Sequence, residues 1–418
     1  MTRVVAERAS LRTPTVADSP STGAVLMVSQ HPFPEHIVFR RNVLELLEDG
    51  FEIDVVCLSG SEPLNGLATH PRLRLRPVRV QHRRGRAIRY LFEYAAFFLS
   101  SLCLVSALSL RRRYDAVQVD NLPDLLVFTT IVPRLRGVRV VFNMFELTPE
   151  MVAARFSGRL GAVLTRVASW VEAAATSWAD HVIVVSQECW ERVHRRGVPE
   201  EKLSIVLNTT SWPSPTADAS KVPARDGEAS FLVVHSTLVE RYGIDVAIRA
   251  FAQLASRWPR LTLRVIGDGE QRAALEALAQ QLRVGNRVVF TGQLPWTETI
   301  AQVMQATIGI VSVLADGYGE VLLPTKLLEY ARFGVPAVCS RLAAVRPYFP
   351  DGSITYFEPG NADDLAAVIE RLLEEPGIRK LQAGHAQEVA RGLSWERVRH
   401  SYLQALALDS RVMSEILD

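Results

Sequence analysis

Residues 318–338 read YGEVLLPTKLLEYARFGVPAV and join a predicted helix to a predicted strand. We expect the helix from Pro324 to Phe333, because proline suits the first helical turn, where its missing N–H costs nothing. The apolar run Pro336–Cys339 then follows at strand length. Helical patterns and apolar runs alternate in this way through most of the chain, which predicts an α/β fold with parallel sheets.

The alternation extends in both directions from this stretch and is interrupted once. Strands are predicted at residues 24–28, 53–58, 73–80, 116–119, 138–142, 181–185, 231–234, 261–266, 288–290, 308–313 and 336–339. Helices are predicted at residues 38–47, 91–110, 160–178, 244–258, 270–282, 324–333, 362–374 and 395–407. The interruption, TTSWPSPTADASKVPARDGEAS at residues 209–230, has the composition of a linker.

The linker divides the chain into two halves of similar size. The expected parts are a polar tail at 1–22, a Rossmann-like domain at 23–212, the linker at 213–229, a second Rossmann-like domain at 230–394 and a helical tail at 395–418. Open parallel sheets bind ligands at the carboxyl ends of their strands, so we expect the ligands in a cleft between the two halves.

Composition excludes several classes of protein. The 47 basic and 45 acidic residues leave a net charge of +2, which argues against a nucleic-acid partner. Four widely spaced cysteines, at positions 57, 103, 189 and 339, are expected to be buried and reduced rather than disulfide-bonded or bound to zinc. Fingerprints of dehydrogenases, Walker ATPases, zincins and α/β-hydrolases are absent. We expect no cofactor and no metal, and a cytoplasmic location, since the first 22 residues do not read as a signal peptide.

Lys326 is one of only four lysines in the chain, and its place is unusual. A lysine in the first turn opposes the helix dipole unless an anion such as a phosphate lies between them. Glu329, three residues on, shares the helix face and can accept hydrogen bonds from vicinal hydroxyls. Glu320 precedes the helix and is expected to point into the cleft. The alternative is a surface ion pair between Lys326 and Glu329, with Glu320 as a solvated loop carboxylate.

Several stretches resemble family 4 retaining glycosyltransferases. The donor half of that family is similar to residues 231–242, VIGDGE at 265–270, FTGQLP at 290–295 and PTKLLEY at 324–330. Its acceptor half is similar to YDAVQVDNLPDLLVF at 114–128 and FELTPEMVAARF at 145–156. The resemblance covers roughly residues 24–408 and implies a GT-B fold, with two Rossmann-like domains facing across a cleft and a C-terminal helix that crosses back to the first domain.

The resemblance also implies a nucleotide-diphosphate-sugar site in the second half. It matches Glu329 to the family glutamate that holds the ribose hydroxyls, and Lys326 to a lysine beside the phosphates. The further donor contacts that it implies are Ser236, Thr237, Arg241, Gly267, Gly269, Gly292, Gln293 and Leu294. Catalysis is expected to use Glu320, Arg241 and Lys326, which position the sugar and neutralise the leaving diphosphate without a protein nucleophile. Glu35, Glu146 and Glu150 are expected on the acceptor side.

Three positions depart from the family pattern. Val321 stands where the first glutamate of the E-x7-E pair is usual, and we expect Glu320 to replace it. Thr237 takes the place of the usual arginine, and Phe145 the place of a histidine that contacts the donor sugar. The alternatives to a transferase are therefore a degenerate GT-B scaffold that binds nucleotide or a partner enzyme without transfer, and a GT-B epimerase or phosphorylase.

The acceptor half also carries a basic run. Eight arginines and no acid lie between Arg72 and Arg89, directly before the apolar stretch Leu91–Leu110. We expect the stretch to be a buried or half-buried helix over the sheet, or a helix on an anionic membrane face, since its serines and Glu93 disfavour a true span. The run suggests an enzyme docked at the inner face of the plasma membrane, with a lipid-linked glycan as acceptor. The alternatives are a solvated strand face and a soluble small-molecule aglycone.

Overall fold

The computed structural model of this chain describes residues 21–60, 67, 69–79, 87–209 and 230–409. The predicted tail, apart from residues 21 and 22, and the whole predicted linker lie outside these ranges. The chain forms two compact units. Unit 1 comprises residues up to 185, residues 189–211 and residues from 395 onward, and unit 2 comprises residues 186–188 and 212–394.

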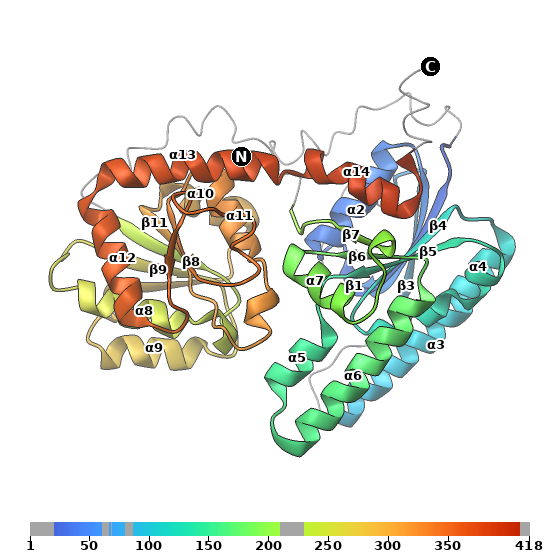
Figure 1. The fold of residues 1–418 in the computed structure, drawn as a ribbon, viewed down its shortest axis with the longest axis horizontal. Helices are drawn as coiled ribbons and strands as arrows, with labels where there is room; N and C mark the ends of the chain where they lie inside the picture. The colour runs from blue at the N-terminus through green and yellow to red at the C-terminus, as the bar shows by residue number, and fades with distance from the viewer. Residues whose placement is uncertain (1–20, 61–66, 68, 80–86, 210–229, 410–418) are drawn as a thin grey trace. The chain divides into compact units, whose positions relative to one another are not determined.

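Unit 1 is built on a seven-stranded sheet in the order β3-β2-β1-β4-β5-β6-β7, and every pairing in it is parallel (Figure 1). Its strands are β1 (Ala24–Phe33), β2 (Glu52–Ser59), β3 (Leu73–Val78), β4 (Ala116–Asp120), β5 (Arg139–Met144), β6 (His181–Val184) and β7 (Leu203–Ile205). Its helices are α2 (Ile37–Glu48), α3 (Ala87–Arg111), α4 (Ile131–Leu135), α5 (Thr148–Arg155), α6 (Gly158–Trp178), α7 (Gln187–Arg195) and α14 (Trp395–Leu406), with 3₁₀ turns η2 (Asp124–Thr130) and η3 (Glu200–Lys202).

Strand β1 shows why these segments pair as a parallel sheet. Central parallel strands are covered on both faces and therefore read as continuous apolar runs. Val25 and Met27 pack with α2 on one face, and Leu26 and Val28 pack with α3 on the other. All four side chains are fully buried.

The C-terminal helix α14 belongs to unit 1. The Tyr402 hydroxyl of α14 donates a hydrogen bond of 2.7 Å to Gln118 Oε1 of β4. The Arg41 guanidinium of α2 lies 3.8 Å from the centre of the Trp395 ring, and this stacking is a favourable cation–π contact. The predicted return of the C-terminal helix to the first half of the chain is therefore confirmed.

Helix α3 covers the other face of the sheet with a narrow buried stripe. Residues 93, 97, 101, 105 and 109 are buried, four residues apart. Two of these five are serines, whereas Phe92 and Leu99 on the outer side are 72% and 59% exposed. The segment Phe92–Arg111 is long and apolar enough to cross a membrane by length and composition, and only 28% of its apolar window is buried.

Unit 2 is built on a six-stranded parallel sheet in the order β10-β9-β8-β11-β12-β13. Its strands are β8 (Phe231–His235), β9 (Thr262–Ile266), β10 (Val288–Gly292), β11 (Ile308–Val311), β12 (Ala337–Ser340) and β13 (Thr355–Phe357). Its helices are α8 (Ile244–Leu254), α9 (Arg272–Gln281), α10 (Trp296–Gln305), α11 (Thr325–Arg332), α12 (Ala362–Glu374) and α13 (Pro376–Gly392), with 3₁₀ turns η5 (Glu240–Tyr242) and η6 (Gly319–Val321). The predicted α/β fold with two parallel sheets is confirmed.

Some features differ from the expectations. The three-residue strands β7 and β13 were not predicted, because three residues are too few to show a period. Helix α13 was not predicted either, since its sequence PGIRKLQAGHAQEVARG holds three glycines and few large apolar residues. Cys57, Cys189 and Cys339 are buried as expected, but Cys103 on α3 is exposed, so the prediction was wrong for that thiol.

Candidate functional site

The sheet of unit 2 reverses its strand order between β8 and β11. Ligands of open parallel sheets bind at such a switch point, at the carboxyl ends of the strands. The loops that leave β8 and β11 are joined there, because Leu314 N–H donates a 2.8 Å hydrogen bond to the carbonyl of Arg241. The candidate site of unit 2 is therefore built from these loops and the start of α11.

His235, the last residue of β8, lies at the centre of this site. Its Nε2 hydrogen-bonds Glu329 Oε2 of α11, and its Nδ1 lies 2.8 Å from the Tyr330 hydroxyl. Burial lowers the pKa of His235, so the ring is neutral at pH 7. A neutral ring that donates from Nε2 must accept at Nδ1, which fixes the tautomer. Sequence analysis missed His235, whose partner lies 94 residues away.

Glu329 is a buried carboxylate held by two donors. Its side chain is 5% exposed, and Lys326 Nζ lies 3.4 Å from Oε1. Burial alone would raise the pKa of Glu329, but the hydrogen bond from His235 and the charge of Lys326 outweigh it, and the pKa is lowered. The ion pair of the alternative interpretation is thus present, but it is not a surface pair. The Lys326 side chain is 38% exposed, so its ammonium group at the start of α11 is accessible to solvent.

Arg241 brings a second cation to the switch point. It lies in η5, after β8, with its guanidinium carbon 4.1 Å from the centre of the Tyr318 ring. Its Nε is 3.6 Å from Asp316 Oδ2, in the loop after β11. Both side chains are partly exposed, so the pair is screened by solvent and is a weak one. The ring contact and the ion pair thereby orient the guanidinium, whose side chain is 27% exposed.

Three predicted glycines let the neighbouring loops approach. Gly267, after β9, has φ +135°, and a Cβ there would lie 1.9 Å from the carbonyl oxygen of Ser236. A Cβ at Gly269 would lie 2.4 Å from the carbonyl oxygen of Leu238. Gly292, the last residue of β10, has φ +74°, and its carbonyl accepts a 2.9 Å hydrogen bond from Gly267 N–H. Only glycine fits where backbone packs against backbone at such distances.

Glu320 is held in place rather than free to move. It lies in η6, and its Oε2 accepts a 3.0 Å hydrogen bond from the backbone N–H of Ala343. The carbonyl of Glu320 accepts a second bond from Ala344 N–H, at 3.1 Å. The two backbone amides fix the position of Glu320, and its role toward a donor sugar stays a prediction.

The remaining predicted donor contacts line the same strand ends. Thr237 and Gln293 are exposed, and Ser236 and Leu294 are half-buried. All of the residues predicted for the donor side thus lie in unit 2, in the segments after β8 and β9 (η5 included), at and just after the end of β10, in η6 and in α11. Their roles toward a ligand remain predictions.

The predicted acceptor residues all lie in unit 1. Glu35 follows β1 and Glu146 follows β5, and both are half-buried. Asn121 Nδ2 donates a 2.6 Å hydrogen bond to the Glu146 carbonyl, which fixes the backbone after β5. Glu150 is different, because it is buried and its Oε1 contacts both Arg192 and Arg196. The Glu150 carboxylate is therefore buried in ion pairs with two arginines and does not lie on an exposed surface.

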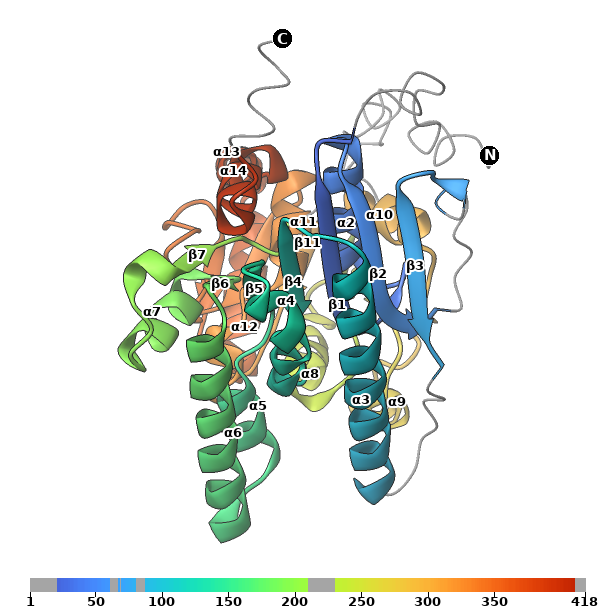
Figure 2. The ribbon, with the colours of Figure 1, turned by 90° about the vertical axis from the view of Figure 1, so that its right-hand side faces the viewer.

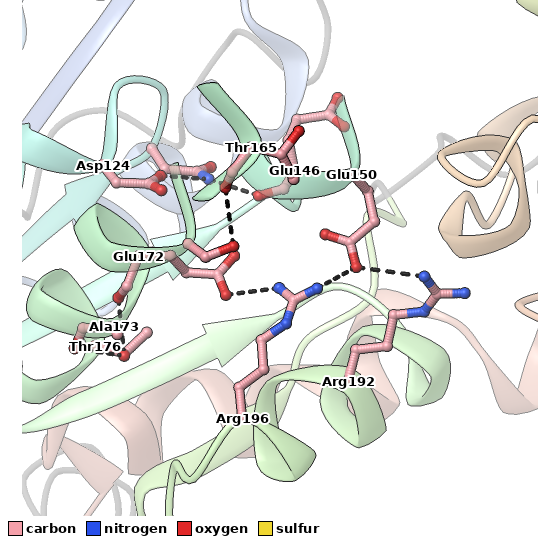
Figure 3. Close-up of polar contacts among 11 residues, drawn as sticks. Asp124, Glu146, Glu150, Thr165, Glu172, Ala173, Thr176, Arg192 and Arg196 are labelled. Atoms are coloured by element: carbon pink, nitrogen blue, oxygen red, sulfur yellow. Dashed lines mark hydrogen bonds and ion pairs between the residues drawn. The ribbon is translucent and has the colours of Figure 1, made fainter. Parts of the chain in front are cut away.

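Figure 3 shows how these ion pairs tie three helices together. Arg196 reaches Glu150 of α5 and, at 2.6 Å, Glu172 of α6, while Arg192 of α7 lies 3.3 Å from Glu150. Burial raises the pKa of Glu172 to about 7, although the charge of Arg196 lowers it in part. The network holds the α5–α6 pair against α7.

The arginines of β3 and Arg72, which directly precedes it, do not form a free basic face. Arg72 is buried, and its Nη1 donates to the Gly50 carbonyl at 3.1 Å. Arg74 pairs with Glu52 at 2.8 Å, and Arg76 with Asp54 at 3.3 Å. Arg74 and Arg76 are therefore paired with acids of the neighbouring strand β2, and Arg72 with a backbone carbonyl, whereas the membrane contact of the run stays a prediction. Positions 83, 84 and 86 of the run lie outside the described residues.

Within the described ranges no group of three histidine, cysteine or carboxylate side chains is placed to hold a metal ion. A shallow hollow of about 470 Å³ lies between α5 and α6, lined by Ala153, Phe156, Gly161, Ala162, Thr165, Arg166, Ser169 and Trp170. It lies in unit 1, away from the candidate site of unit 2, and its lining is mostly apolar.

Comparison with known proteins covers both units. Residues 36–209 match the family model of the glycosyl transferase 4-like domain, and residues 216–389 match glycosyl transferases group 1. The lipopolysaccharide core biosynthesis glycosyltransferase LpsE of Rhizobium meliloti is 28% identical over 63% of this chain and 72% of its own. A UDP-glucuronate:glycolipid 2-beta-glucuronosyltransferase of Xanthomonas campestris pv. campestris is 32% identical over 32% of this chain, a match that spans only 30% of the relative.

Solved structures agree in fold. Sucrose-phosphate synthase from Thermosynechococcus elongatus superposes with a TM-score of 0.71 over 92% of this chain and 99% of its own, at 19% identity. Anabaena Alr3699/HepE, solved in complex with UDP and glucose, superposes with a TM-score of 0.66 over 95% of this chain and 100% of its own, at 18% identity. With two parallel-sheet units and both family models matched, this chain belongs to the group 1 glycosyltransferases of GT-B fold.

Proposed function

We propose that this protein is a retaining transferase that moves a sugar from a nucleoside-diphosphate donor to an acceptor hydroxyl in cell-surface glycan assembly. The observation that carries the proposal is the group His235, Glu329 and Lys326 at the switch point of unit 2. It combines an ionised carboxylate suited to vicinal ribose hydroxyls with a cation suited to phosphate. The UDP bound by Alr3699/HepE supports a nucleotide ligand of this kind.

In the proposed reaction the acceptor oxygen forms a bond to the anomeric carbon while the bond from that carbon to the diphosphate breaks. The electron pair of the broken bond goes to the diphosphate oxygen, which also takes the acceptor's proton. Arg241 and Lys326 would stabilise the charge that develops on the leaving group, and Glu320 would orient a sugar hydroxyl. Arg241 and Lys326 would neutralise the leaving diphosphate, as a divalent metal does in metal-dependent glycosyltransferases. We therefore expect activity to persist in EDTA.

The acceptor is proposed to be a glycan carried by a lipid. LpsE and the glycolipid glucuronosyltransferase bear names that point to lipopolysaccharide and glycolipid acceptors. Unit 1 adds a structural argument, because α3 and α6 run in the same direction and their N-terminal ends project beyond the sheet (Figure 2). Phe92 near the start of α3 is 72% exposed, and Leu160 near the start of α6 is 67% exposed.

The segment from α5 into α6 combines apolar and basic side chains. Leu160, Val163 and Trp170 are exposed by 67%, 58% and 71%. Arg155, Arg159 and Arg166 are exposed beside them, and residues 151–171 contain no acid. Amphipathic helices with this composition bind in the headgroup region of anionic membranes. The proposed location is thus the cytoplasmic face of a membrane, contacted through α3 and the α5–α6 pair.

Sedimentation with phosphatidylglycerol vesicles tests the membrane contact. We expect the protein to pellet with these vesicles at low salt and not with phosphatidylcholine vesicles. The double variant Leu160→Ser/Trp170→Ser should pellet at least about tenfold less, since each large apolar side chain contributes about 1.5–3 kcal/mol when fully buried. Leu381→Ser is the matched control, because Leu381 is 61% exposed on α13 of unit 2. Equal pelleting of all three proteins would contradict the proposed surface and favour a soluble aglycone.

Incubation with UDP-, GDP- and dTDP-sugars tests the transfer itself. We expect one donor to be consumed, with release of its nucleoside diphosphate, when a lipid-linked glycan extract is added. The sugar should keep its anomeric configuration. Binding of a donor without consumption in the presence of any acceptor would instead support the degenerate scaffold. Turnover of the donor alone, or with inorganic phosphate, would indicate an epimerase or a phosphorylase.

A further inference from the structure

The candidate site of unit 2 contains two buried polar side chains, His235 and Tyr330, whose rings take no part in the proposed reaction. They reach the switch point from different elements, His235 from the end of β8 and Tyr330 from α11. His235 is 4% exposed and Tyr330 is fully buried, so a nucleotide has little or no surface of either ring to contact. The residue through which they can act on a ligand is Glu329, which is hydrogen-bonded to His235.

Tyr330 is fixed by the backbone of the two central strands. Its ring packs on Gly309 of β11, where a Cβ would lie 2.7 Å from the ring, so only glycine leaves space for it. Its hydroxyl lies 2.8 Å from His235 Nδ1 and 3.2 Å from the carbonyl oxygen of Val233 in β8. Burial raises the pKa of Tyr330, so the hydroxyl keeps its one proton at neutral pH. It therefore donates to His235 Nδ1, the nearer acceptor, from a position that the strands set.

Tyr330 and Glu329 give the two nitrogens of His235 opposite roles. Nδ1 accepts from the Tyr330 hydroxyl, and Nε2 donates to Glu329 Oε2. The tautomer with its proton on Nε2 is the one in which a neutral ring satisfies both contacts. Without the Tyr330 hydroxyl the ring could carry its proton on Nδ1 instead, and Nε2 would then have no hydrogen to donate to Glu329.

The carboxylate held in this way keeps two acceptor positions. An ionised carboxylate accepts about four hydrogen bonds, of which His235 supplies one at Oε2 and Lys326 Nζ, 3.4 Å away, one at Oε1. The two that remain match the vicinal 2′- and 3′-hydroxyls of a ribose. A 2′-deoxyribose offers one hydroxyl there, and so leaves one acceptor of a carboxylate that is 5% exposed without a donor. An unpaired buried acceptor is costly, which is why polar sites reject ligands that lack a hydroxyl.

We propose that His235, held by Tyr330, is a positioning residue that fixes the Glu329 carboxylate for the two ribose hydroxyls and so makes the site select ribonucleoside over 2′-deoxyribonucleoside diphosphates. This role of His235 rests on the proposed function, since it takes Glu329 as the ribose contact. Sugar selection then depends on a side chain that lies 94 residues from Glu329 in sequence and need not touch the ligand. The nucleotide of the donor is accordingly UDP or GDP rather than dTDP, whose sugar is a 2′-deoxyribose.

Isothermal titration with matched pairs of ligands tests this role on the full chain. The pairs are UDP with 2′-deoxyuridine diphosphate and GDP with 2′-deoxyguanosine diphosphate, and the quantity compared is the Kd of the deoxy ligand divided by that of the ribo ligand. We expect a wild-type ratio of at least about tenfold for the base that binds. His235→Phe should bring the ratio below about threefold, because Glu329 loses its donor at Oε2 and is no longer held for the diol. Each ratio is measured on one protein, so a change in the folded fraction cancels from it.

Three further variants separate positioning from a general loss of structure. Tyr330→Phe keeps the ring but removes the hydroxyl, and it should lower the ratio by about threefold or more. Tyr356→Phe is its matched control, because it removes another buried hydroxyl of unit 2, which donates a 2.6 Å hydrogen bond to the Phe349 carbonyl, and it should leave the ratio unchanged. Arg241→Ala should weaken both ligands of a pair alike, since its charge is proposed to act on the diphosphate that they share.

The possible results bear differently on the proposed function and on the role of His235. If no nucleoside diphosphate binds the wild type, both are wrong. If a ribonucleoside diphosphate binds but the wild-type ratio is below about threefold, or His235→Phe keeps the wild-type ratio, the role of His235 alone is wrong. Should His235→Phe fail to fold, the Tyr330→Phe ratio and the ¹⁵N resonances of the wild-type His235 decide. An unchanged Tyr330→Phe ratio, or a proton on Nδ1 rather than Nε2, would overturn the proposal.

Discussion

Replacement of His235 by phenylalanine is expected to destabilise the protein in a pH-dependent way. The change removes the hydrogen bond to Glu329, whose side chain is 5% exposed. Hydrogen bonds to charged groups contribute about 1.5–3 kcal/mol. The remaining partner, Lys326 Nζ at 3.4 Å, is itself 38% exposed and screened, so it compensates little. We expect the free energy of unfolding at pH 7 to fall by about 2–3 kcal/mol.

The pH dependence follows from the direction of two pKa shifts. The pKa of Glu329 is lowered in the folded protein, so its contribution to stability is complete above the unfolded value of about 4.3 and is lost as the pH falls through the folded value. The pKa of His235 is lowered by burial, so its contribution is also lost as the pH falls below about 6.5. The difference between wild type and His235→Phe should therefore be largest at pH 7 and shrink by pH 4.5.

Urea unfolding followed by circular dichroism at pH 7 and pH 4.5 measures this difference. His235→Gln should recover part of the loss, because its amide can still donate toward Glu329. His385→Phe, at an exposed histidine, should change little. A loss below about 0.5 kcal/mol at pH 7, or an equal loss at both pH values, would refute the assignment of a buried, ionised Glu329 held by neutral His235.

Three further substitutions test other parts of the structure. Gly267→Ala should lower the melting temperature and weaken nucleotide binding, since its Cβ would lie 1.9 Å from a carbonyl oxygen at φ +135°; a melting temperature equal to that of the wild type would contradict this. Arg196→Leu should cost about 3–5 kcal/mol in urea unfolding, because Glu150 and Glu172 would remain buried without their shared cation; a loss under about 1 kcal/mol would show that the network is not needed. Asp120→Asn should gain stability relative to wild type as the pH rises from about 4 to about 7, because burial raises the pKa of Asp120 to about 7, and the free energy of unfolding of the wild type falls between the unfolded pKa of about 3.9 and that folded value; a stability difference that stays constant across this range would contradict it.

The sequence predicts the sheets well because their strands are continuous apolar runs bounded by turn residues. The place of Lys326 in the first turn of α11 could also be predicted, because Pro324 marks the start of the helix, whereas Gly267 was expected only from the family resemblance. These are local signals. They require no knowledge of which strands pair.

The features that were missed depend on pairing between distant residues. The partner of His235 lies 94 residues along the chain, and nothing in the strand FLVVH indicates it. Arg74 is opposite Asp54 in the β2–β3 register, so a run that reads as an open basic face is partly neutralised. The stacking of the His31 ring of β1 on the His36 ring, with ring centres 4.1 Å apart, depends on the course of the chain between β1 and α2. Such contacts follow from tertiary structure and have no periodic signal.

Isothermal titration of UDP, GDP and dTDP into the wild type, Lys326→Ala and Glu329→Gln tests the central claim most directly. The account expects one nucleoside diphosphate to bind the wild type. Lys326→Ala should raise its Kd roughly 10- to 100-fold, because a charge-assisted contact of about 1.5–3 kcal/mol is lost. Glu329→Gln should also weaken binding, and Arg332→Ala, further along the same helix, should not. If no nucleoside diphosphate binds the wild type, or if Lys326→Ala and Glu329→Gln bind as tightly as the wild type, the switch point of unit 2 is not the donor site.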